Sequence, residues 1–87
     1  MSTPSRLEVT FYTKAGCHLC ADAREMLEEI AEETAYTLTE IDIRSDMAIF
    51  EIYRYRIPVI IINQETFVEG KIDAAELAQA FRQARGE

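Results

Sequence analysis

The sequence predicts an α/β domain with a central four-stranded mixed sheet flanked by helices, in the element order βαβαββα. Residues 7–12 and 36–43 alternate apolar and polar side chains, which is the period-two pattern of half-buried strands. Between them, apolar residues recur every three or four positions from Leu19 onwards, which indicates one buried face of a helix. Residues 57–62 form a near-continuous apolar run, typical of a strand that is buried on both faces.

The first half of the chain predicts a strand, a long helix and a second strand. We expect the helix to end near Thr34, with acidic residues on the faces away from its apolar stripe. Because a helix connects the two strands, they should run parallel with a right-handed crossover. The apolar stripe consists of Leu19, Ala23, Met26, Leu27, Ile30 and Ala31.

The second half predicts a short helix followed by a hairpin. Ser45 or Asp46 can cap a short helix that runs through Tyr53. After the apolar run, residues 63–64 can turn the chain so that residues 65–69 return as an antiparallel strand.

A last helix should follow the hairpin. Gly70 breaks the strand before it, and residues 73–76, Asp-Ala-Ala-Glu, form the capping-box pattern of a helix start. We therefore interpret residues 7–85 as a single domain, preceded by a flexible arm of residues 1–6. The apolar stripe of this helix is Ala74, Leu77, Ala78, Phe81 and Ala84.

The totals exclude several classes of protein. A chain of 87 residues has room for one core only. A formal net charge of −7 argues against binding to a nucleic-acid backbone, because such binding needs a basic surface. The sequence contains no apolar signal core and no segment long enough to span a membrane, so we expect a cytoplasmic monomer.

The two cysteines, Cys17 and Cys20, are the strongest functional signal. They stand two residues apart, directly after the first predicted strand and at the start of the first predicted helix. Unpaired N–H groups and the positive end of the helix dipole favour a thiolate at such a position, and thiolate is the reactive form of cysteine. Cys20 lies within one helical turn, so the pair can close a disulfide. The motif therefore predicts a dithiol/disulfide redox centre.

Two other interpretations of the cysteine pair remain open. The thiols could hold a metal ion or an iron–sulfur cluster, although a structural zinc ion takes four ligands and His18 lies between the cysteines. A cluster that bridges two chains would need added ligands. Alternatively, the cysteines could only pack in the core of a redox-silent adaptor.

The chain resembles proteins of the thioredoxin fold, and glutaredoxins more closely, over residues 7–85. The resemblance rests on the run Val9-Thr10-Phe11-Tyr12-Thr13-Lys14-Ala15-Gly16-Cys17-His18-Leu19-Cys20, on Ile57-Pro58-Val59, and on Gly70 to Asp73. These segments are similar to the glutaredoxin strand and C-P-Y-C site, the cis-proline T-V-P and the G-G-x-x-D turn that binds glutathione. The chain is most similar to small bacterial glutaredoxin-like proteins with a C-H-L-C site.

The resemblance implies a thiol–disulfide oxidoreductase that reduces protein or glutathione mixed disulfides. Cys17 would attack and Cys20 would resolve the mixed disulfide. Protein disulfides would be the partners, glutathione or a thioredoxin-reductase-type system would be the reductant, and no cofactor would be tightly bound. We expect Lys14 and His18 to modulate the Cys17 thiolate, and Pro58 to be cis and to lie against the cysteines.

The resemblance also predicts a glutathione or substrate site. His18-Leu19 replaces the usual Pro-Tyr, Ile57 replaces a smaller residue before the proline, and Lys71 replaces the second glycine of the turn. These replacements imply that glutathione binds weakly. Two cations that precede the proline, Arg54 and Arg56, are candidates to meet one of its carboxylates. The expected site residues are Lys14, Arg56, Ile57, Pro58, Gly70 and Asp73.

Overall fold

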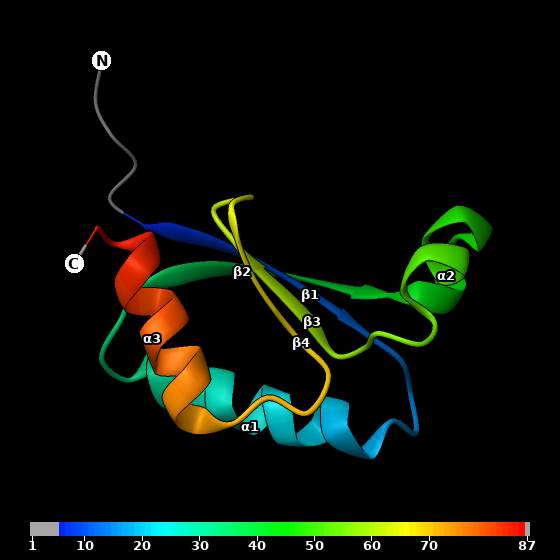
Figure 1. Cartoon of the computed structure of the whole chain (residues 1–87), viewed down its shortest axis with the longest axis horizontal. Helices are drawn as coiled ribbons and strands as arrows, with labels where there is room; N and C mark the ends of the chain where they lie inside the picture. The colour runs from blue at the N-terminus through cyan, green and yellow to red at the C-terminus, as the bar shows by residue number, and fades with distance from the viewer. Residues whose placement is uncertain (1–5, 87) are drawn as a thin grey trace.

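The computed structural model describes residues 6–86, and the expected flexible arm lies outside the described residues except for Arg6, which is exposed. The elements follow the predicted order (Figure 1). They are β1 (Leu7–Thr13), α1 (His18–Ala31), β2 (Tyr36–Asp42), a 3-10 turn (Ile43–Ser45), α2 (Met47–Tyr53), β3 (Val59–Ile62), β4 (Thr66–Glu69) and α3 (Ala74–Ala84).

The four strands form one mixed sheet in the order β2-β1-β3-β4. β1 and β2 are parallel, and the β1–β3 and β3–β4 pairs are antiparallel, as predicted. Tyr12 lies opposite Val59 in the register, so the C-terminal end of β1 and the N-terminal end of β3 meet at the same end of the sheet. This end carries both the loop to α1 and the segment before β3.

One face of the sheet forms the main core with α1 and α3, which lie side by side beneath it in Figure 1. β1 contributes Val9 and Phe11, and β3 contributes Ile60 and Ile62, all at most 1% exposed. From the helices, the buried residues of this cluster are Cys20, Ala23, Leu27, Leu77, Ala80 and Phe81. Both predicted apolar stripes therefore supply the core.

Several boundaries differ by a few residues from the expected ones. α1 ends at Ala31 rather than near Thr34, and the following residues form hydrogen-bonded turns. The last turn of α1 has no basic residue to offset the helix dipole. β2 ends at Asp42 because Ile43 starts the 3-10 turn and is fully buried. β3 begins at Val59 because Pro58 has no N–H to donate to the ladder.

α2 lies at the end of the sheet and leaves most of the second sheet face uncovered (Figure 1). Asp46 is its N-cap and accepts from the N–H groups of Ala48 and Ile49. No residue of α2 is buried, and Ile52 is 55% exposed. α2 contacts the second face through the Tyr53 ring, which stacks on Tyr12 with a centroid distance of 4.1 Å. The helix therefore borders the site end of the sheet instead of covering a face.

No helix in the part of the chain that the structure describes has both the length and the apolar character that a membrane crossing requires.

The burial pattern predicts very different costs for the same substitution at two leucines. Leu27 of α1 is 1% exposed in the core, whereas Leu38 of β2 is 40% exposed. Leu27→Ala should lower the free energy of unfolding by about 2–5 kcal/mol, because it leaves a cavity. Leu38→Ala should cost less than about 1 kcal/mol. Urea unfolding of both variants tests this, and equal losses would contradict the assigned core.

Candidate active site

The loop between β1 and α1 places both cysteines at the start of the helix. Gly16 has a φ of 82°, a left-handed conformation that suits glycine, and the N–H of Cys17 donates to the carbonyl of Lys14 at 3.2 Å. Cys17 is the N-cap of α1, and its Sγ accepts from the N–H of Cys20 at 3.2 Å. The two cysteines form a disulfide, with their Cα atoms 5.2 Å apart. The predicted pairing is thus present at the predicted helix start.

The two sulfurs have different surroundings. Cys20 is 2% exposed and belongs to the core cluster, whereas Cys17 is half-buried and packs against the edge of that cluster. A reaction partner can therefore reach Cys17 but not Cys20. This asymmetry agrees with an attacking Cys17 and a resolving Cys20.

His18 lies on the solvent side of the first turn, with a side chain 90% exposed. Its Nε2 lies 4.0 Å from Oδ2 of Asp22, one helical turn further on. Its influence on Cys17 therefore stays a prediction.

Lys14 borders a shallow cavity of about 340 Å³ on the β2 side of the cysteine loop. The pKa of Asp42, which lines the same cavity, is below its ordinary value of 3.8, mainly through hydrogen bonds from Arg44 and to a lesser extent through the charge of Lys14. Arg24 forms a hydrogen-bonded ion pair with Glu40 in this cavity. Two cations here face two carboxylates, so the cavity has no excess of either charge.

The Ile57–Pro58 peptide is cis, as predicted. Pro58 is buried and precedes the Val59–Tyr12 pair, so it lies at the sheet end that carries the cysteine loop. Ile57 packs against the same core cluster as Cys17. The N–H of Ile57 donates to the carbonyl of Tyr53 at 3.2 Å. This backbone group is therefore already used within the chain.

Arg56 is held by β4 and α2. Its guanidinium donates to both carboxylate oxygens of Glu69, at 2.8 and 3.3 Å, and lies 5.3 Å from the Tyr53 ring centroid. The hydrogen bonds from Arg56 keep the pKa of Glu69 below its ordinary value of 4.5. Arg54 lies over the rings of Phe50 and Tyr55 and 4.0 Å from Glu51. Both expected carboxylate ligands therefore have contacts inside the chain.

The cluster of Tyr12, Tyr53, Arg56 and Glu69 was not predicted from the sequence. Tyr12 faces the second side of the sheet and stacks on Tyr53. Val59 of β3 is paired with Tyr12 of β1 on one side and with Glu69 of β4 on the other. The side chains of Tyr12, Val59 and Glu69 therefore lie next to each other on the same face of the sheet. The sequence pattern places Glu69 at an outward position of its strand. It does not identify Arg56 as the partner of Glu69, because this pairing depends on where α2 ends.

Gly70 and Asp73 lie in the connection from β4 to α3. Gly70 has a φ of 77°, and its N–H donates to the carbonyl of Pro58 at 2.9 Å. Asp73 is the N-cap of α3, and its Oδ1 accepts from the N–H of Glu76 at 2.7 Å. Asp73 and Leu19 border the same cavity, of about 330 Å³. Of the two residues between the cysteines, Leu19 therefore shares a cavity with the end of the predicted turn.

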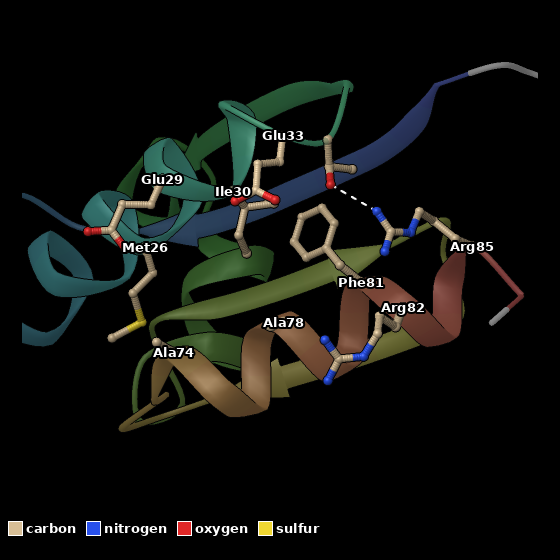
Figure 2. Close-up of a pocket in the computed structure, with 10 residues that line it drawn as sticks. Met26, Glu29, Ile30, Glu33, Ala74, Ala78, Phe81, Arg82 and Arg85 are labelled. Carbon is tan, nitrogen blue, oxygen red and sulfur yellow. Dashed lines mark hydrogen bonds between the residues drawn. The ribbon is translucent and has the colours of Figure 1, made fainter.

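Another cavity, of about 350 Å³, lies between α1 and α3 and contains neither cysteine. Figure 2 shows Ile30 of α1 turned towards the Phe81 ring of α3, while Met26 of α1 points towards Ala74. Arg85 donates to the hydroxyl of Thr34 at 2.9 Å across its far end. Within residues 6–86, no group of three or more His, Cys, Asp or Glu side chains is arranged to hold a metal ion.

The Arg56–Glu69 pair predicts a change of titration in a single variant. Arg56→Gln should raise the pKa of Glu69 towards 4.5. In the native chain the lowered pKa of Glu69 contributes stability at pH values above the ordinary pKa of 4.5. This contribution is lost as the pH falls through the pKa that Glu69 has in the folded protein. Carboxyl titration by NMR measures the shift. Arg54→Gln is the matched control, and an equal shift there would contradict the assigned pair.

Comparisons with known proteins agree with this geometry. The family model of the glutaredoxin-like domain (DUF836) matches residues 8–82. The Glutaredoxin-like protein YDR286C homolog of Dictyostelium discoideum is 30% identical over 77 residues, which cover 82% of this chain and 71% of that protein.

Solved structures have the same fold. The protein XcR50 of X. campestris superposes with a TM-score of 0.75 at 27% identity, covering 86% of this chain and 96% of that one. A thioredoxin from Halobacterium salinarum superposes with a TM-score of 0.71 at 20% identity, covering 92% of this chain and 75% of that one. The sheet and its helices thus form a thioredoxin fold, and with its cysteine pair at the start of α1 the chain belongs to the glutaredoxin-like domain family.

Proposed function

We propose that the protein is a thiol–disulfide oxidoreductase that reduces protein disulfides or mixed disulfides through the Cys17–Cys20 pair. One observation carries this proposal: a half-buried cysteine caps a helix and is bonded to a fully buried cysteine one turn inside it. In such a pair, one sulfur can react with the substrate and the other can resolve the mixed disulfide that forms. Two cysteines are too few for the disulfide framework of a small secreted domain, which supports work in a reducing cytoplasm.

The reaction starts from the dithiol. The Cys17 thiolate attacks one sulfur of the substrate disulfide, a new S–S bond forms, and the other substrate sulfur leaves as a thiolate. Cys20 then loses its proton and attacks Sγ of Cys17, which releases the second substrate thiolate. Two electrons have passed to the substrate, and the Cys17–Cys20 disulfide remains. Two molecules of a thiol such as glutathione, or a thioredoxin-reductase-type system, return the pair to the dithiol.

The helix start supports the first step. The N–H of Cys20 already donates to Sγ of Cys17, so the same donor can stabilise the thiolate. A substrate that reacts with Cys17 would lie near Pro58, at the same end of the sheet. Because the Ile57 N–H is bonded to Tyr53, an extended peptide that pairs there must displace this hydrogen bond.

The alternative role as a metal or cluster carrier would need ligands beyond those gathered in residues 6–86. Metal analysis of the purified protein tests it. A stoichiometric metal ion or cluster that is lost in Cys17→Ser would favour this role over the proposed reaction.

Single cysteine variants test the proposed function. Cys17→Ser should abolish reduction of insulin disulfides, because the remaining thiol, Cys20, is buried. Cys20→Ser should still attack, but should accumulate a mixed disulfide that mass spectrometry detects on Cys17. Circular dichroism checks that both variants fold. Full activity of Cys17→Ser, or a trapped adduct on Cys20 instead, would contradict the assigned roles.

A further inference from the structure

The segment of residues 54–58, which joins α2 to β3, borders the redox centre (Figure 1). The antiparallel pairing of β1 with β3 ends one residue before Thr13 and Pro58, so these two residues follow it side by side. Next along the chain, the carbonyl of Lys14 accepts from the N–H of Cys17 at 3.2 Å. A protein chain whose disulfide reacts with Cys17 therefore meets this segment, whereas a small disulfide needs only the sulfur itself.

Tyr53, the last residue of α2, holds this segment in place. No residue of α2 is buried, so the helix itself does not anchor the segment to the core. The carbonyl of Tyr53 accepts from the N–H groups of Arg56 and Ile57, at 2.8 and 3.2 Å, and its ring stacks on Tyr12 of β1. The position of the segment therefore depends on the contacts that hold Tyr53 and Arg56 to the sheet.

The ion pair of Arg56 with Glu69 ties the same segment to β4. The guanidinium donates to both carboxylate oxygens of Glu69, at 2.8 and 3.3 Å, and lies 5.3 Å from the centroid of the Tyr53 ring. Directly after β4, the N–H of Gly70 donates to the carbonyl of Pro58 at 2.9 Å. Side-chain and backbone contacts thus connect the segment to the same strand end, and Arg56 occupies the space between the carboxylate and the ring.

We propose that Arg56 and Glu69 are positioning residues of the redox centre, whose ion pair holds residues 54–58 where a protein substrate lies against them. The inference rests on the proposed function and states which contacts adapt it to protein disulfides. Glu69 shares a sheet face with Tyr12, away from the core cluster that contains Cys20, so it acts through Arg56. Because two hydrogen bonds hold the pair, the upper part of the range for exposed ion pairs applies, about two- to fivefold.

Two single variants separate positioning from direct binding of the substrate. Arg56→Gln removes the guanidinium, whereas Glu69→Gln leaves the positive charge and frees it. If the pair positions the segment, both variants should lose the same property. If Arg56 bound a substrate anion itself, Glu69→Gln would strengthen binding. Arg44→Gln is the matched control, because Arg44 forms a similarly exposed ion pair with Asp42 at the same end of the sheet without contacting the segment.

Single-turnover kinetics give the first measurement. The reduced protein is mixed with insulin or with hydroxyethyl disulfide, and its remaining thiols are alkylated after set times and counted. In both Arg56→Gln and Glu69→Gln, the half-saturating concentration of insulin should rise about two- to fivefold while the limiting rate is unchanged. The rate with hydroxyethyl disulfide should stay at its native value in both variants. Arg44→Gln should match the native protein with both disulfides.

Amide hydrogen exchange tests the positioning without any reaction. The N–H of Ile57, which is bonded to Tyr53, should exchange about two- to fivefold faster in Arg56→Gln and Glu69→Gln, by the same loss of the ion pair. The N–H of Leu77, which is bonded to Asp73 in α3, should keep its native rate and so show that the fold is intact.

The outcomes distinguish the inference from the proposed function. A loss in Arg56→Gln alone, an equal loss with both disulfides, or unchanged kinetics and exchange would each overturn the positioning role and leave the proposed function standing. Failure of the native protein to reduce either disulfide would overturn the proposed function, and the inference would fall with it.

Discussion

The position of Cys17 as the N-cap of α1 is the constraint on which the rest of the site depends. A cap residue must stand outside the helix with its side chain turned back to the first N–H groups, and here that side chain is the reactive sulfur. Helix geometry then places Cys20 inside the first turn, where the core against β1 and β3 buries it. One local arrangement thus produces an accessible sulfur, a donor that favours its charge and a protected resolving thiol.

A second set of contacts fixes the opposite side of the redox centre. Tyr12 stacks on Tyr53, Arg56 lies against the Tyr53 ring, and Glu69 holds Arg56 from β4. These contacts connect β1 and β4, the two strands beside β3, to the end of α2. They therefore border the segment that contains Pro58. Because Arg56 is engaged in this way, it stabilises the protein's own loop, and an incoming anion does not meet a free guanidinium there.

The sequence was sufficient for features that depend on local pattern. Period-two and helical spacing identified the strands and the stripes that include Leu27 and Phe81, and the resemblance identified the cis Pro58. Pairings that depend on tertiary position could not be predicted. The charge of Arg56 suggested a ligand, but only the register that sets Glu69 beside Val59 reveals its partner. Asp73 caps α3, as the capping-box pattern predicted, and its contact with glutathione stays a prediction.

The proposed reaction requires that the helix start hold Cys17 as a reactive thiolate. The most direct test is the rate of iodoacetamide alkylation of reduced Cys20→Ser against pH, with the urea-unfolded protein as reference. The folded protein should reach half of its maximum rate well below pH 8.5, roughly the pKa of an unperturbed cysteine thiol, and urea should restore that ordinary value. A folded midpoint at or above that of the unfolded chain would show that the helix start does not stabilise the thiolate.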